Sequence, residues 1–170
     1  RGGGLPLLRP LDPALDLVST LDELDLELPP AVTAPLLTSV PAALGAGVED
    51  VLLAALAIAA EEVRARHGLD DGRSGLLVSL EGHGREEDVA GGADLSRTVG
   101  WFTTIAPVAV DPSADVTHAV KSAKEERLGQ PDGGLGFGVL RYGADTELAQ
   151  RPLPSIGFNF FGAGRAGRPA

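Results

Sequence analysis

Hydrophobic positions recur at helical spacing in three parts of the chain. The clearest is residues 48–63, where apolar residues follow the i, i+3, i+4, i+7 rule and His67-Gly68 supplies a basic last turn and a left-handed stop. Its apolar positions are Val48, Val51, Leu52, Ala55, Leu56, Ala59 and Val63. The same spacing predicts a short helix over 32–41 and another that starts near 116 and stops near Gly129.

Other apolar runs predict strands. Residues 76–80 indicate a buried strand, and residues 98–110 a second one, bent or broken at Pro107 because proline cannot donate to a central ladder. Residues 156–161 indicate a last short strand, and an imperfect alternation of leucine with acidic residues predicts one or two strands over 15–28. Alternating strands and helices favour a two-layer α/β fold.

The most informative feature of the composition is its net charge, which bears on the possible partners. The 170 residues are enough for one domain or one lobe of a larger one, without an internal repeat. Lys and Arg number 14 against 24 Asp and Glu, a net charge of −10, so no basic stripe is available for nucleic acid or for an anionic membrane surface. We therefore expect no nucleic-acid partner and no membrane partner.

The absence of cysteine excludes a disulfide framework and a thiolate nucleophile, and fits a reducing, cytoplasmic compartment. The longest apolar run, 51–60, is half of the ~20 residues that a membrane helix needs. The first residues carry neither a Met start nor a signal-peptide pattern, so we expect the chain to come from the middle of a longer protein.

The common cofactor and nucleophile motifs are not present. Glycines 134, 136 and 138 do not fit the dinucleotide fingerprint, residues 72–75 do not fit a nucleophile elbow, and the three histidines lack metal-ligand spacing. Two classes of function therefore remain: catalysis without a cofactor or metal, and binding without catalysis.

The densest polar cluster, residues 81–86, follows the predicted buried strand, where an α/β sheet presents functional groups. One interpretation is a charged turn in solvent, with Arg85 paired to Glu86, Glu87 or Asp88. The other is a carboxylate base, Glu81, at the mouth of a cleft.

Two further stretches allow two interpretations each. Residues 94–104 are either a capped turn feeding a strand that buries Val99, Trp101 and Ile105, or a channel wall built from Gly100 and the threonine hydroxyls. Asn159, between phenylalanines, is either a hydrogen-bonded strand-end amide or a polar group aimed into an apolar pocket.

Four stretches in this order resemble the C-terminal motifs of the epimerization domains of nonribosomal peptide synthetases. They are Glu81-Gly82-His83-Gly84-Arg85-Glu86, Arg97-Thr98-Val99-Gly100-Trp101-Phe102-Thr103, Pro131-Asp132-Gly133-Gly134-Leu135-Gly136-Phe137-Gly138-Val139-Leu140-Arg141-Tyr142 and Phe158-Asn159-Phe160-Phe161-Gly162. The resemblance covers residues 15–162, with 1–14 as a linker or lobe connection and 163–170 as a flexible tail. Phe137 and Phe160 stand where the family commonly has Tyr, which excludes a hydroxyl role for Phe160.

The resemblance implies a chloramphenicol-acetyltransferase-like α/β sandwich, of which this chain is the C-terminal lobe. The family's paired-histidine motif belongs to the N-terminal lobe and is missing here. Condensation domains, the near relatives, usually lack the Glu-Gly-His-Gly-Arg-Glu motif and more often carry Val-Asn where this chain has Thr103-Thr104. The epimerization interpretation is therefore favoured over amide-bond-forming condensation. A non-catalytic docking platform is the other alternative, which the missing paired-histidine motif permits.

The implied activity inverts the α-carbon of an aminoacyl or peptidyl residue, held as a thioester on the phosphopantetheine arm of a carrier protein, with no cofactor. The implied catalytic residues are Glu81, Arg85 and Asn159, and the implied substrate-binding residues are His83, Gly100, Trp101, Phe102, Thr103 and Phe160. A histidine of the N-terminal lobe would be the second acid/base, so we expect the lobe alone to be inactive.

A guanidinium beside Glu81 would oppose its use as a base. We therefore expect Arg85 to point elsewhere, towards Glu86, Glu87 or Asp94.

Overall fold

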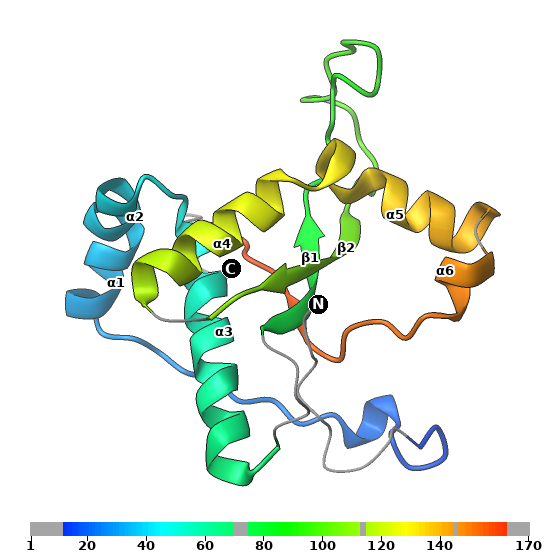
Figure 1. The fold of residues 1–170 in the computed structure, drawn as a ribbon. Helices are drawn as coiled ribbons and strands as arrows, with labels where there is room; N and C mark the ends of the chain where they lie inside the picture. Colours follow the sequence, from blue (N-terminus) through cyan, green and yellow to red (C-terminus); the bar gives the residue numbers. More distant parts are fainter. Residues whose placement is uncertain (1–11, 70–74, 113–114, 145, 163–170) are drawn as a thin grey trace, which may run out of the picture.

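The computed structural model describes residues 12–69, 75–112, 115–144 and 146–162, which form a small mixed sheet with helices packed against it (Figure 1). In the described residues the order of elements is η1 (Val18–Thr20), α1 (Pro30–Leu37), α2 (Ser39–Leu44), α3 (Val48–His67), β1 (Leu76–Gly82), β2 (Thr104–Val110), α4 (Val116–Leu128), η2 (Pro131–Gly134), α5 (Leu135–Val139), the π-helical turn η3 (Leu140–Ala144), α6 (Thr146–Gln150) and β3 (Gly157–Phe158). The strand order is β2-β1-β3, with β2 antiparallel and β3 parallel to β1.

The core lies between the sheet and helices α3 and α4, which pack on each other and on the strands. Alternate residues of β1 and β2 face it, as the period of two in a strand requires. They are Leu76, Val78, Leu80, Ala106, Val108 and Val110, and all are buried together with Ala119, Val120 and Ala123 of α4. The predicted strand over 76–80 and the predicted helix from 116 are confirmed.

Helix α3 is also confirmed, with Gly68 as a left-handed C-cap (φ 64°), but it buries a different face from the predicted one. Ala55, Ala59 and Val63 are exposed. The buried face comprises Asp50, Val51, Leu53, Ala54, Ala57, Ala60 and Arg64. The helix is apolar on nearly every side between its ends, so spacing alone could not select the face.

Strand β2 is shorter than predicted, because residues 98–103 are not in a strand, and it is not broken at Pro107. Pro107 lies opposite Ser79, whose N–H donates instead to the carbonyl oxygen of Ile156 (2.8 Å). The carbonyl oxygen of Pro107 accepts from Gln130 Nε2 (3.1 Å). The proline nitrogen therefore faces away from β1, and no ladder hydrogen bond is lost.

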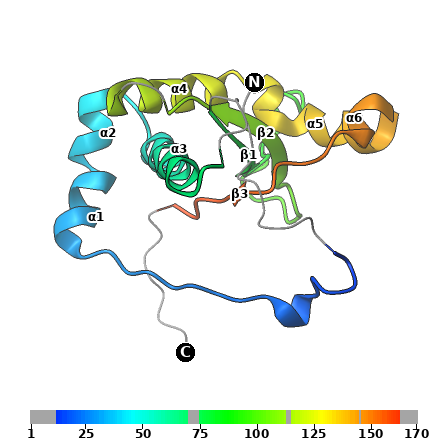
Figure 2. The ribbon, with the colours of Figure 1, turned by 60° about the horizontal axis from the view of Figure 1, so that its bottom comes forward.

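The strands predicted over 15–28 are not formed: the segment holds only η1 and otherwise extended, exposed chain (Figure 2). It has no partner strand within the described residues, and leucine alternation cannot supply one. The helix predicted over 32–41 is two short helices separated at Thr38. Of the strand predicted over 156–161, only Gly157–Phe158 pairs with β1.

Within the part of the chain that the structure describes, no single helix is long and apolar enough to cross a membrane. The bent pair Pro30–Leu44 and Val48–His67 passes the length and composition test only when taken together. The predicted flexible tail, 163–170, and most of the predicted linker, 1–14, lie outside the described residues.

Candidate functional site

A cavity of about 430 Å³ lies at the C-terminal end of β1. Five of the residues that the sequence singled out line it: Glu81, His83, Thr103, Asn159 and Phe160. Glu81 is the half-buried last-but-one residue of β1, whereas Asn159 and Phe160 directly follow β3, the neighbouring strand. Because β1 and β3 are parallel, their C-terminal ends meet at one edge and bring these residues together.

The backbone after β1 explains the glycine of the His83-Gly84-Arg85 sequence. Gly84 is buried with φ 62°, and a Cβ there would collide with the carbonyl oxygen of Phe102. His83 Nδ1 accepts the backbone N–H of Arg85 (3.0 Å). The chain therefore turns sharply out of β1 while His83 stays at the cavity.

Arg85 points away from the cavity, as expected, but its partners are not the carboxylates that we expected. Its Nη1 donates to the carbonyl oxygens of Leu95 (2.5 Å) and Thr98 (3.1 Å). Its guanidinium carbon lies 4.4 Å from the centre of the Phe102 ring. Glu87 instead accepts the backbone N–H of Leu95 (2.9 Å). Arg85 thus fixes the loop of residues 83–103, which projects from the body in Figure 1.

Of the two interpretations of residues 94–104, the one in which Val99, Trp101 and Ile105 face the core is wrong. Trp101 is 91% exposed, Val99 is fully exposed, and Ile105 is half exposed. Val99 and Trp101 precede the strand, which begins only at Thr104, so they have no sheet to pack against, whereas Ile105 lies in β2 on the face opposite the core. Gly100, Trp101 and Phe102 do not line the cavity, and their role in substrate binding stays a prediction.

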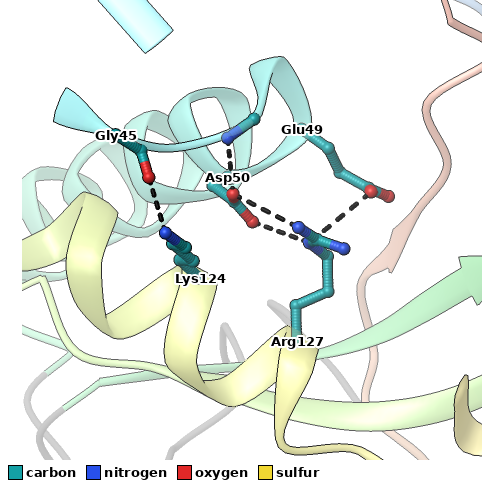
Figure 3. Close-up of polar contacts among 6 residues, drawn as sticks. Gly45, Glu49, Asp50, Lys124 and Arg127 are labelled. Carbon is teal, nitrogen blue, oxygen red and sulfur yellow. Dashed lines mark hydrogen bonds and ion pairs between the residues drawn. The ribbon is translucent and has the colours of Figure 1, made fainter. Parts of the chain in front are cut away.

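Residues that the sequence analysis missed also line the cavity, among them Glu49, Arg127 and Gln130. Asp50, fully buried in the first turn of α3, accepts Arg127 Nε at Oδ1 (2.7 Å) and Arg127 Nη2 at Oδ2 (3.3 Å), as Figure 3 shows. Oδ2 also accepts the backbone N–H of Gly47 (2.8 Å). The partners are far apart in sequence, so no local motif could have revealed them.

Glu49 shares this cluster, with Oε2 3.7 Å from Arg127 Nε. Burial raises the pKa of Glu49 above its ordinary value, although the charges of Arg127 and His83 act in the opposite direction. The hydrogen bonds to Asp50 raise the pKa of Arg127 in turn. The cavity lining therefore carries a guanidinium fixed by Asp50 next to a carboxyl whose pKa is raised by burial.

The Pro131-Asp132-Gly133-Gly134 turn packs one more element against β2. Asp132, Gly133 and Gly134 all have positive φ (49°, 59° and 83°), and a Cβ on Gly134 would lie 2.8 Å from Cβ of Ala106. Thr104 Oγ1 donates to the carbonyl oxygen of Gly133 (3.0 Å). This part of the motif has a packing role that its glycines make possible.

A second cavity, of about 370 Å³, borders this turn at Gly134 and is mostly apolar. It is lined by Ile105, Leu135, Phe137 and Tyr142 among others, and Thr103 borders both cavities. Among the described residues, no three His, Asp or Glu side chains come together as a metal ion requires.

Similarity to known proteins identifies the family of this chain. The model of the condensation-domain family matches residues 10–161. This chain belongs to the condensation-domain family. It is 44% identical over 134 residues to a chondramide synthase from Chondromyces crocatus, covering 78% of this chain but only 3% of that protein.

The solved structures similar to it include two synthetase domains. One is the epimerization domain from the third module of tyrocidine synthetase B, with a TM-score of 0.61 and 34% identity, over 78% of this chain and 30% of that one. The other is the first condensation domain of the calcium-dependent antibiotic synthetase, with a TM-score of 0.53 and 23% identity, over 78% and 26%. The expected fold class is confirmed, and the chain spans less than a third of either solved chain.

Proposed function

We propose that this chain is the C-terminal lobe of an epimerization domain that inverts the α-carbon of an aminoacyl or peptidyl thioester on a carrier protein. The observation that carries the proposal is the position of Glu81, which lines a cavity with His83 and Asn159 at the end of β1. The similarity to an epimerization domain at 34% identity supports it.

The chemistry needs a base, a stabilised enolate and an acid. Glu81 takes the α-proton, the C–H electron pair forms a double bond from Cα to the carbonyl carbon, and the carbonyl π pair moves onto oxygen. Return of a proton to the opposite face restores the carbonyl and inverts the centre. The thioester itself acidifies Cα, so no cofactor is required.

The surroundings of Glu81 suit this role. Arg85 is held by backbone carbonyl oxygens and by Phe102, so its charge is directed away from the carboxylate. Asn159, at the cavity beside Phe160, offers an amide N–H for the enolate oxygen.

The partners follow from the same proposal. Inversion needs a second acid/base on the opposite face of the substrate, and the paired-histidine N-terminal lobe of the domain would supply it. The substrate would enter on the phosphopantetheine arm of a peptidyl carrier protein. The isolated lobe should then be inactive, because only one wall of the tunnel is present to exclude water.

Amide-bond formation is the second candidate, and the match to the condensation-domain family favours it. It predicts a new peptide product when a second loaded carrier is added, with no α-proton exchange. The evidence against it is the motif that begins at Glu81, which condensation domains usually lack, and the Thr103-Thr104 pair, where they more often carry Val-Asn.

The test uses the full-length protein that contains this chain. We expect it to incorporate deuterium from D₂O at the α-carbon of a carrier-bound aminoacyl thioester. Glu81→Gln should slow this exchange by roughly 10²- to 10⁴-fold, the usual loss when a proton-transfer group is removed, while circular dichroism stays unchanged.

Glu86 lines the same cavity and provides the comparison. Wild-type exchange in Glu81→Gln together with its loss in Glu86→Gln would assign the base to Glu86. Peptide product without exchange would replace the proposal by condensation.

A further inference from the structure

Arg127 is the only arginine or lysine among the described residues that line the cavity. The other ionisable side chains there are the carboxyls of Glu49, Glu81 and Glu86 and the imidazole of His83. Arg85, the arginine of the sequence motif, is bonded elsewhere. A cavity in which an enolate oxygen develops therefore contains one side chain with a permanent positive charge.

The guanidinium of Arg127 is held in one orientation. The carboxylate of Asp50, itself 0% exposed, binds Nε and Nη2 side by side. The backbone N–H of Gly47 holds the same carboxylate in turn. A donor fixed in this way does not have to reorient as charge develops, which is what makes electrostatic stabilisation effective.

One nitrogen of the guanidinium remains available. Nη1 makes none of the hydrogen bonds or ion pairs of Arg127 among the described residues. Figure 3 shows one guanidinium nitrogen on the side away from Asp50 with no dashed line. Glu49 forms its ion pair with Arg127 at Nε, where Oε2 lies at 3.7 Å, beyond hydrogen-bond distance.

Lys124 shows what a purely structural cation on the same helix looks like. Its Nζ donates to the carbonyl oxygen of Gly45 (2.6 Å), which ties α4 to the connection between α2 and α3. It does not line the cavity. Lys124 and Arg127 thus both tether α4, but only Arg127 also faces the candidate site.

We propose that Arg127 is a catalytic residue, whose Nη1 group donates a hydrogen bond to the substrate's carbonyl oxygen as it becomes the enolate, and that Asp50 is its positioning residue. The proposal rests on the proposed function. Arg127 does not exchange a proton in this step: Glu81 removes the α-proton, and the charge that appears on oxygen is balanced by the guanidinium. Asn159 cannot replace it, because a neutral, exposed amide with no hydrogen bond among the described residues is neither charged nor fixed.

The experiment measures α-deuterium exchange on a carrier-bound aminoacyl thioester by the full-length protein and three variants. Arg127→Gln should lower the maximal exchange rate by roughly 10²- to 10³-fold, the loss seen when one oxyanion donor is removed, with little change in KM for the loaded carrier. Arg127→Lys keeps the positive charge but loses the paired N–H donors of the guanidinium. Its exchange rate should lie between those of the wild type and Arg127→Gln. Lys124→Gln, the matched control, should keep the wild-type rate.

The outcomes separate this inference from the proposed function. Exchange at the wild-type rate in a folded Arg127→Gln protein overturns the role of Arg127 and leaves the proposed function standing. No exchange in the wild-type protein overturns the proposed function and the inference with it.

A purely structural role predicts that Lys124→Gln and Arg127→Lys lose exchange in parallel with thermal stability. That result would also overturn the proposal. If Arg127→Gln does not fold, the comparison of Arg127→Lys with Lys124→Gln decides.

Discussion

The layer of α3 and α4 on the sheet and the N-terminal segment 12–29 are both rich in leucine and valine, yet their burial is opposite. In the layer, Leu53, Leu76 and Val78 are 0% exposed. In the segment, all seven large apolar side chains are more than half exposed, up to 92% at Val18. Apolar composition alone therefore does not bury a residue; it needs a facing surface to pack on.

The loop of residues 83–103 belongs with the segment in this comparison, since Val99 and Trp101 are exposed there. Its backbone is nevertheless fixed, through Arg85, Glu87 and Gly84. Exposed apolar side chains on an ordered loop are typical of a surface that contacts other protein. A second lobe, as proposed, would provide such a surface for the loop and the segment.

The largest expected effect on stability comes from comparing the same leucine-to-alanine substitution at one site in each region. Leu53→Ala should lower the free energy of unfolding of this chain by about 2 to 5 kcal/mol, because it leaves a cavity in a packed layer. Leu24→Ala, at an 84% exposed site in the segment, should change it by less than about 0.5 kcal/mol. Denaturant unfolding followed by circular dichroism measures both, and equal losses would erase the difference between the regions.

A smaller effect is expected at Glu49, on the border of the packed layer. Its pKa is raised above 4.5 in the folded state, so the folded protein binds this proton more tightly than the unfolded chain. The stability it contributes is present below pH 4.5 and is lost as the pH rises through the folded-state pKa.

Glu49→Gln should remove this loss, so the variant should be at least as stable as wild type at neutral pH. The measurement is the difference between variant and wild type in denaturant midpoint from pH 4 to pH 7. A variant that becomes progressively less stable than wild type towards neutral pH would mean that the ion pair with Arg127 outweighs burial.

The smallest effect is expected in the loop. Trp101→Ala should change the unfolding free energy of this chain by less than about 0.5 kcal/mol, since a 91% exposed ring has little contact to lose. Thermal unfolding of the 170-residue chain is sufficient to measure it. A loss of several kcal/mol would place Trp101 in the core, as its strand-like neighbourhood predicts from sequence.

The sequence predicted the elements whose signals are local. Gly68 ends α3 and Gly129 caps α4, and the apolar run of β1 is found where it was expected. Much of the candidate site was also predictable, because Glu81 lies at the end of β1 and His83 directly follows that strand in the chain. The strands predicted over 15–28 are not formed, since a strand depends on a partner that leucine spacing does not reveal.

What the sequence by itself determined is therefore the order and type of the main elements and the motif that places Glu81 at a strand end. Only the tertiary structure decided which face of α3 is buried, where Arg85 points, and that Asp50 and Arg127 meet across 77 positions. The physical reason is that helix caps and apolar periodicity act between near neighbours. Burial and ion pairing depend on which distant elements the fold brings into contact.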